Sequence, residues 1–445
     1  MLKLMAWIRR QPWLQVVYER FPQSWRVRAS QVLVARNLKK ARLPVLPVPG
    51  PHRDAAPADA IGPEQRTVTE YPSSAGVNIF AYFRGQFGLG ESARLYARAL
   101  IEAGYPVALH DIDISAPHGW DDRSLDHCIG DAAPHPVNLI FVNPDYLAQA
   151  MASIDRAKME GRHVIACWFW ELERIPEEWL WAVQRVDEIM VASAFVERAF
   201  RQVTDKPILR VPVPIGATED SGLTREQFGL PGDSFIFLNT FDFNSWWHRK
   251  NPIAAIRAFR LAFPRAREDV ALLIKSSNGH RYPEQLHQLL AAAAGDPRIL
   301  IRDDVIDGRH VHALHRCADA YVSLHRAEGF GLGLAEAMAL GKPVIATRWS
   351  GNMEFMTTHN SCLVDYRLVP VGDSEYVHAA NCEWAEPDVG HAAEFMQRVV
   401  SDPVFARSIG DRAARDIRDG LSPAAASRRI IDRLDSLATT RDLQD

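Results

Sequence analysis

The amino-acid sequence predicts an α/β protein built from two Rossmann-like, doubly wound domains. At 445 residues, the chain is longer than a usual single domain. Short apolar runs alternate with helical stretches in both halves, as in sheets whose parallel strands are connected by helices. In each half a glycine-rich turn follows an apolar run and precedes a helical stretch, at residues 85–90 and at residues 329–333. We therefore expect two domains of similar architecture.

The composition is that of an ordinary globular protein, with 47% hydrophobic and 24% charged residues. The net charge of −4 gives no indication of a nucleic-acid partner. Five cysteines without a C-x-x-C spacing favour reduced thiols in a cytosolic protein. No apolar run is long enough to span a bilayer, and the N-terminus lacks the pattern of a signal peptide.

Residues 1–42 form a basic amphipathic N-terminal arm. Ten lysines and arginines stand against one acidic residue, so the arm carries 10 − 1 = +9 and the remainder −4 − 9 = −13. Trp7, Trp13 and Trp25 interleave with the basic residues, which is typical of a segment on an anionic membrane surface. The alternative is a helical arm packed on its own domain. Residues 43–75 are rich in proline and predict a loose linker.

The first domain is expected over residues 76–212. Val77–Phe83 predicts a strand, Gly85–Gly90 a tight turn and Glu91–Ala103 an amphipathic helix. The turn lacks G-x-G-x-x-G spacing, so a structural β–α turn is the alternative to a ligand-binding loop. The further strands of this domain are expected at Val107–Ile112, Val137–Val142, Val164–Phe169, Glu188–Val191 and Ile208–Val211.

The strand at Val164–Phe169 leads into a cluster of candidate ligand residues, because ligands gather at the carboxyl ends of strands in open α/β sheets. Trp168 and Trp170 offer flat faces for sugar rings, and Glu171 could accept a proton or hold a hydroxyl. The alternative is that the tryptophans belong to the core and that Glu171 pairs with an arginine.

Asp111 and Asp113 have the D-x-D spacing of metal-dependent sugar transferases. They close a strand, and no other metal-ligand spacing occurs in the chain. We therefore interpret them as structural and predict no metal site.

The second domain is expected over residues 213–395, after a hinge near Val211–Gly216. Its first strand, Phe235–Asn239, leads to the adjacent cations Arg249 and Lys250, just before a helix that ends at Leu261. Arginine grips phosphate oxygens in a fork and lysine adds a point charge, so the pair suits a diphosphate. The alternative is a solvated basic turn.

Residues 318–346 predict a second β–α–β unit. A strand at Ala318–Leu324 precedes the glycine-rich turn, and a helix at Leu334–Leu340 ends where Gly341 favours a left-handed cap. Val344–Ala346 is the returning strand.

The turn of this unit combines an anion site with two carboxylates. Gly329, Gly331 and Gly333 allow close backbone approach, and the helix N-terminus attracts a phosphate. Glu328 and Glu336, with seven residues between them, could accept hydrogen bonds from ribose or hexose hydroxyls. The combination suits a nucleotide-sugar, whereas a tight turn with solvated glutamates is the alternative.

Glu328 to Glu336 resembles the E-x7-E motif of the family four retaining glycosyltransferases, which have the GT-B fold of two Rossmann-like domains facing across a cleft. The resemblance covers roughly residues 76–435. It implies that Glu336 holds the nucleotide ribose and that Arg249 and Lys250 bind the donor diphosphate. It also implies that the donor sugar and diphosphate are held by Glu328, Gly329, Phe330, Gly331 and Leu332.

The resemblance has further implications that depend less on the motif itself. Gly88 and Gly90 would neighbour the diphosphate or the acceptor, and the loop ending at Val305 would lie by the nucleobase. Many family members carry a histidine in the region of Glu171, where this chain has none. The C-terminal helices, residues 396–445, would include one that returns to the first domain.

The expected function is metal-independent transfer of a sugar from a nucleotide diphosphate donor to an acceptor hydroxyl, with retention of configuration and no further cofactor. The acceptor would be a carbohydrate or a lipid-linked glycan of the cell envelope, at the inner face of the cytoplasmic membrane. The alternatives are a sugar-nucleotide epimerase or phosphorylase of the same fold, or a non-catalytic nucleotide-sugar-binding scaffold.

Overall fold

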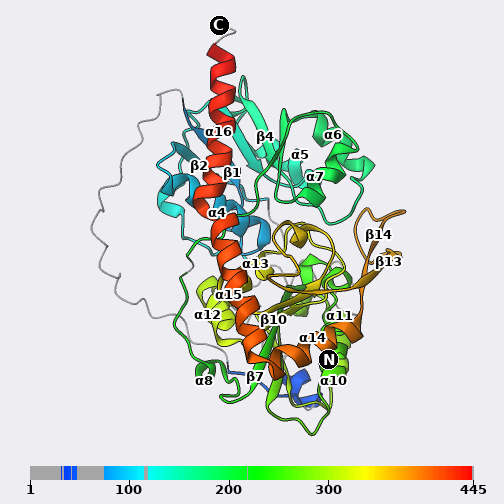
Figure 1. Cartoon of the computed structure of the whole chain (residues 1–445). Coiled ribbons are helices and arrows are strands. Elements are labelled where there is room, and N and C mark those ends of the chain that lie inside the picture. Colours follow the sequence, from blue (N-terminus) through cyan, green and yellow to red (C-terminus); the bar gives the residue numbers. More distant parts are fainter. Residues whose placement is uncertain are drawn as a thin grey trace, which may run out of the picture.

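The computed structural model describes residues 32, 35–41, 43–47, 75–114, 119–217 and 219–442. Two parallel six-stranded sheets, each covered by helices, form an upper and a lower domain (Figure 1). The expectations for residues 1–31 of the basic arm and for residues 48–74 of the linker lie outside the described residues. Within the described part, no helix combines the length and apolarity needed to cross a bilayer.

The first domain contains every strand that was predicted for it. The sheet order is β2-β1-β3-β4-β5-β6, and all the pairings are parallel. The strands are β1 Val77–Ala81, β2 Val107–Asp111, β3 Val137–Phe141, β4 His163–Cys167, β5 Glu188–Val191 and β6 Ile208–Arg210. The connecting helices are α4 Gly88–Glu102, α5 Pro144–Ser153, α6 Leu180–Gln184 and α7 Ala194–Arg201.

The second domain repeats this architecture, with the sheet order β12-β11-β10-β7-β8-β9. Its strands are β7 Phe235–Asp242, β8 Val270–Ser277, β9 Ile299–Asp303, β10 Ala320–Ser323, β11 Val344–Thr347 and β12 Cys362–Val364. Its helices are α8 Arg225–Phe228, α9 Trp247–Lys250, α10 Pro252–Ala262, α11 Pro283–Ala293, α12 Gly308–Cys317, α13 Leu332–Ala339, α14 Val389–Ser401 and α15 Pro403–Gly420. Gly341 follows α13 with φ of 69°, so the predicted left-handed cap is confirmed.

The strand order decides where the predicted loops meet. The chain starts the second sheet at β7, continues to β8 and β9, and then returns to place β10 on the other side of β7. Ligands bind outside the carboxyl ends of strands at such a switch point. The loop with Arg249 follows β7 and the glycine-rich turn follows β10, so both loops lie at this point.

A β-hairpin that was not predicted extends from the second domain toward the first. It pairs β13 Tyr366–Pro370 with β14 Glu383–Pro387 in antiparallel register and projects at the side of the molecule in Figure 1. Tyr376 and Trp384 of this segment are buried in the apolar cluster that contains Trp168 and Trp170 of the first domain. The hairpin therefore closes one side of the space between the domains.

The chain crosses between the domains twice. The first crossing is residues 211–217, and the second lies between α15 and α16 Pro423–Asp442. The backbone N–H of Ile215 donates to the carbonyl of Leu421 at 2.7 Å, so the two crossings run side by side. Figure 1 shows α16 passing upward along α4, and Arg433 of α16 binds Glu188 of β5. Of the C-terminal helices, α16 therefore covers the first domain.

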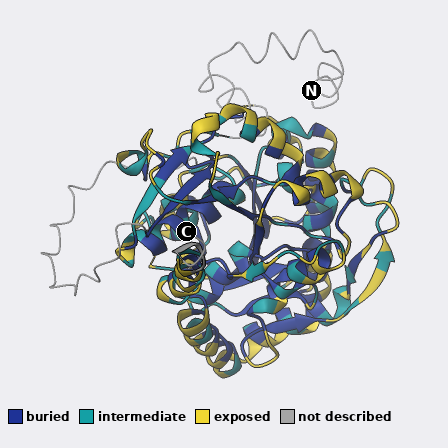
Figure 2. Ribbon diagram, turned by 90° about the horizontal axis from the view of Figure 1, so that it is seen from above, coloured by how far each residue is buried: buried dark blue, intermediate teal, exposed yellow. Residues whose placement is uncertain are grey.

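The described part of the N-terminal segment lies on the second domain. Leu38 and Leu43 are each 4% exposed and belong to the apolar core of that domain. Arg302 donates to the carbonyl of Pro47. Figure 2 shows how burial is distributed over the whole fold. Buried residues occupy the sheets, and exposed residues lie on the outer faces of the helices.

We expect Arg433→Ala to destabilise the protein by about 2–3 kcal/mol, because the almost fully buried Glu188 loses a guanidinium that donates two hydrogen bonds. Burial raises the pKa of Glu188, but the hydrogen bonds from His163 and Arg433 outweigh it, so the net pKa is lowered. A lowered pKa contributes stability at neutral pH that is lost on acidification.

The measurement is urea denaturation of the variant and of the exposed-residue control Arg428→Ala at neutral and acidic pH. The difference from wild type should shrink as the pH falls toward the carboxyl range. A variant that matches the control at neutral pH would contradict the role of this ion pair.

Candidate functional site

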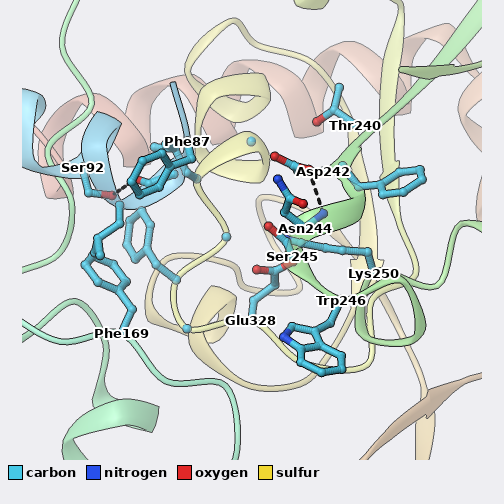
Figure 3. A pocket seen from close by; sticks show the side chains of 18 of the residues that line it. Phe87, Ser92, Phe169, Thr240, Asp242, Asn244, Ser245, Trp246, Lys250 and Glu328 are labelled. Carbon is cyan, nitrogen blue, oxygen red and sulfur yellow. Dashed lines mark hydrogen bonds and ion pairs between the residues drawn. The ribbon is translucent and has the colours of Figure 1, made fainter. Parts of the chain in front are cut away.

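A cavity of about 740 Å³ opens between the two domains. Its walls come from the segments that follow β1, β3 and β4 in the first domain and β7 and β10 in the second. Figure 3 shows Glu328, Lys250 and Trp246 on one side of it, with Phe87 and Phe169 of the first domain opposite. The cleft expected from the sequence is therefore present.

The two predicted cations sit on a short helical turn with a constrained backbone. Trp246, with φ of 64°, precedes α9, and Asn251, with φ of 48°, follows it. Left-handed backbone is uncommon for residues other than glycine and costs energy, so it persists only where the surroundings impose it. Here it turns Arg249 and Lys250 inward, and Arg249 is only 4% exposed. The alternative of a solvated basic turn is therefore wrong.

Both cations bind Glu328. Arg249 Nη1 donates to Glu328 Oε2 at 3.0 Å and to the carbonyl of Ala327 at 2.8 Å. Lys250 Nζ donates to Glu328 Oε1 at 2.5 Å. Burial raises the pKa of Glu328, but Lys250 and Arg249 outweigh it and hold the pKa at about 2. Nε of Arg249 has no hydrogen-bond partner among the described residues, which leaves one donor unused.

The glycine-rich turn reaches α13 through a left-handed residue. Gly331 has φ of 96°, and within the described chain no side chain caps the helix N-terminus. A Cβ at Gly329 would stand 3.1 Å from the carbonyl oxygen of Trp170, and Ser193 Oγ donates to the carbonyl of Gly329 at 2.7 Å. The first domain therefore contacts this turn closely and forms a hydrogen bond with it. The positive end of the α13 dipole faces the cavity that Leu332 and Gly333 line.

Glu336 lies between the domains on α13. It lines the main cavity and also a neighbouring cavity of about 800 Å³ on the side of the interdomain crossings. Burial and the charge of Glu91 on α4 raise the pKa of Glu336 to about 8. The group therefore carries a proton at neutral pH and does not repel an anion bound nearby.

Glu171 of the first domain connects the two domains across the cavity. One carboxylate oxygen lies 3.6 Å from Arg249 Nη2, and the other accepts a hydrogen bond from the hydroxyl of Tyr376 at 2.6 Å. The predicted alternative, pairing with an arginine, is therefore the one found. Tyr376 reaches Glu171 from the hairpin, which has no counterpart among the predicted elements.

Of the two alternatives for Trp168 and Trp170, the core position is the one found. Trp168 and Trp170 are 0% and 2% exposed, so they are core residues and not platforms for sugar rings. Their indole N–H groups donate to the carbonyls of Val142 and Arg174. Phe169, between them, lines the cavity instead, because side chains alternate between the two faces of extended backbone.

The remaining predicted residues differ in whether they reach the cavity. Gly88 lines the cavity, whereas Gly90 lies where a Cβ would stand 2.6 Å from the carbonyl oxygen of Gly85. Val305 is 39% exposed and is not among the described residues that line either cavity. Asp111 accepts a hydrogen bond from the backbone of Arg84 at 3.1 Å, in agreement with a structural role. The described residues form no cluster that could hold a metal ion.

Residues 243–386 match the protein family described as "Glycosyl transferases group 1". Trehalose synthase of Rubrobacter xylanophilus is 26% identical over 205 residues, which are 45% of this chain and 43% of that protein. D-inositol 3-phosphate glycosyltransferase 2 of Catenulispora acidiphila is 27% identical over 216 residues, 45% of this chain and 49% of that protein. The match thus spans less than half the length of these curated relatives.

Solved structures extend the likeness to both domains. HepE of Anabaena, in complex with UDP and glucose, superposes with a TM-score of 0.57 at 15% identity, over 81% of this chain and all of that one. Sucrose-phosphate synthase of Thermosynechococcus elongatus superposes with a TM-score of 0.58 at 17% identity, over 82% of this chain and 100% of that one. The chain has the GT-B fold, as its sequence motif indicated.

We expect Glu336→Gln to make the folded state more stable at neutral and mildly alkaline pH. A carboxyl group whose pKa is raised on folding binds its proton more tightly in the folded state. Stability therefore falls as the pH rises from about 4.3, the ordinary value, to about 8. The glutamine variant lacks this titration.

Thermal denaturation across this pH range should show a difference that widens with pH and is small near pH 4. Glu383→Gln, at an exposed position of β14, is the matched control and should follow wild type. Parallel pH profiles for wild type and Glu336→Gln would contradict the raised pKa.

Proposed function

We propose that this GT-B protein is a glycosyltransferase that moves a sugar from a nucleotide diphosphate donor to an acceptor hydroxyl with retention of configuration. The observation that carries the proposal is the buried pair Arg249 and Lys250 beside the N-terminus of α13, within the interdomain cavity. The activities named for the two curated relatives, and the UDP and glucose bound to HepE, point the same way.

The cations and the helix N-terminus suit the leaving diphosphate. Negative charge grows on this group as the glycosidic bond breaks, and preorganised positive groups stabilise it. Glu328 accepts hydrogen bonds from both cations. A bound diphosphate would share these donors, and Glu328 could then turn toward donor-sugar hydroxyls. Glu336, protonated at neutral pH, would bind ribose hydroxyls without repelling the phosphates.

The contacts of Glu171 agree with a retaining reaction in which no side chain of the protein acts as the base. Its two oxygens face Arg249 and the hydroxyl of Tyr376, so both already have partners in the second domain. We therefore assign the acceptor proton to a donor phosphate oxygen, and to Glu171 the role of holding Arg249.

We further propose a metal-independent reaction in cytoplasmic assembly of cell-envelope polysaccharide or glycolipid. Arg249, Lys250 and α13 supply positive charge where other transferases use a divalent ion. The basic arm would hold the protein at an anionic membrane. In support, Arg36, Lys39 and Lys40 are exposed on the helical segment whose Leu38 is buried in the second domain.

We expect Lys250→Ala and Arg249→Lys to weaken donor binding and slow transfer. Loss of a charged hydrogen bond costs about 1.5–3 kcal/mol, which is roughly 10- to 150-fold in affinity. A panel of nucleotide-sugars, read by the rise in melting temperature of wild type, identifies the donor, and isothermal titration then gives its affinity for each variant.

Arg265→Ala is the control, because Arg265 is exposed at the opposite end of the second domain. Unchanged affinity and turnover in both site variants would contradict the assignment of the diphosphate site. Transfer should proceed in EDTA, and activity that needs added magnesium or manganese would contradict the metal-independent reaction.

We expect the basic arm to bind anionic vesicles in a salt-dependent way. Each basic residue near such a surface contributes about 1 kcal/mol, and the attraction falls off within a Debye length. Vesicle flotation should carry the full chain at low salt and release it as salt rises. A chain shortened to begin at residue 32 keeps the segment that packs on the second domain, so it should stay folded and float less. Equal flotation of the two chains would contradict the membrane role.

A further inference from the structure

Trp246 is an exposed aromatic residue on a constrained backbone at the mouth of the cavity. Its φ and ψ are 64° and 99°, a combination that bulky residues rarely adopt. The residue is 39% exposed and lines the cavity. Neither burial nor backbone preference explains a tryptophan here, and such outliers gather at functional sites.

The hairpin fixes the position of this indole. The ring of Tyr376 lies 5.5 Å from that of Trp246 in an edge-on arrangement, with an angle of 62° between the planes. The Tyr376 hydroxyl is held by Glu171, and its ring also contacts buried Trp170 at 5.8 Å. An edge-on contact covers little of an indole face. Figure 3 shows the indole at the lower edge of the site, below Glu328.

The opposite wall offers polar groups beside further aromatic rings. Asn143, Asp145 and Tyr146 line the cavity where β3 ends, and Tyr146 is 47% exposed. The side-chain amide of Asn143 is bonded to the backbone of Phe169 on the same wall, whereas Asp145 contacts Trp179 and His378 through Oδ1. An apolar ring face together with carboxylate oxygens matches a pyranose, which has C–H faces and equatorial hydroxyls.

The place of Trp246 in the chain separates it from the nucleotide residues. It comes three residues before Arg249, whereas Gly331 and Glu336 belong to the turn and helix of α13. A ring on the indole would therefore lie next to Glu328 and to the hairpin that packs on the first domain.

Resting on the function proposed above, we propose that Trp246 is the platform of an acceptor subsite that binds a hexopyranose ring, with Asp145 as a hydroxyl partner. The acceptor is then a carbohydrate whose terminal sugar stacks on the indole. Tyr376 is a positioning residue that holds the platform and Glu171 together.

The test is saturation-transfer NMR of the full chain with the methyl glycosides of glucose, galactose and mannose, with and without the donor found by melting shift. At least one glycoside should receive saturation on its ring C–H protons and should remain bound when donor is present. Trp246→Gly accepts the left-handed backbone and should lose about fivefold or more of this signal. Trp246→Phe should keep part of it. Trp181→Ala removes a tryptophan of equal exposure on α6 and should behave as wild type.

Three results would overturn the subsite. One is equal saturation in wild type and Trp246→Gly, which includes the case in which neither binds a glycoside at millimolar concentration. Another is displacement of the glycoside by donor. The third is a lost donor-induced melting shift in Trp246→Gly, which would assign the indole to the donor. Failure of the proposed function is distinct, because then no nucleotide-sugar would stabilise wild type.

Discussion

The buried cluster of Arg249, Lys250 and Glu328 is the interaction on which the rest of the site depends. Charges removed from water are costly unless they are paired and hydrogen-bonded. Here one carboxylate serves both cations, and a second carboxylate, Glu171, approaches from the other domain. The cluster is thus close to neutral, and its two cations line the cavity between the domains.

The cluster ties together parts of the chain that are far apart in sequence. The turn of Glu328 is gripped by Ser193 and by the backbone of Trp170, and the hairpin brings Tyr376 onto Glu171. The N–H of Ala194, at the start of α7, donates to Glu354 of the second domain at 2.7 Å. These contacts hold the two domains against each other, and the two chain crossings run side by side near Ile215 and Leu421.

Several features of this site lower the stability of the folded state. Trp246 and Asn251 hold left-handed backbone, and Glu336 keeps a proton that an exposed carboxyl group would lose. Strained backbone and shifted pKa values gather where a protein binds or reacts, because the geometry is imposed by packing elsewhere. The α16 helix, held by Arg433 on Glu188, contributes to the frame that tolerates them.

Much of the fold was determined by local signals in the sequence. Alternation of apolar runs and helices gave the strands of the first sheet and most of those of the second, because buried parallel strands read as continuous apolar segments. The short strand β12 was not predicted. Gly341 and the turn at Gly329–Gly333 were recognisable because only glycine suits such backbone. Glu328 and Glu336 were found because they match the E-x7-E motif, and Arg249 and Lys250 because they are adjacent cations between a strand and a helix.

Only the tertiary structure decided how these residues act on one another. The pairing of Glu171 with Arg249 and the contact of Trp246 with Tyr376 join segments more than 70 residues apart. The burial of Trp168 and Trp170 likewise depends on contacts with other elements. The hairpin with Tyr376 has little periodicity of its own, because its two short strands are separated by a long irregular loop. Its position is determined by packing on the other domain, and no local stretch of sequence determines that packing.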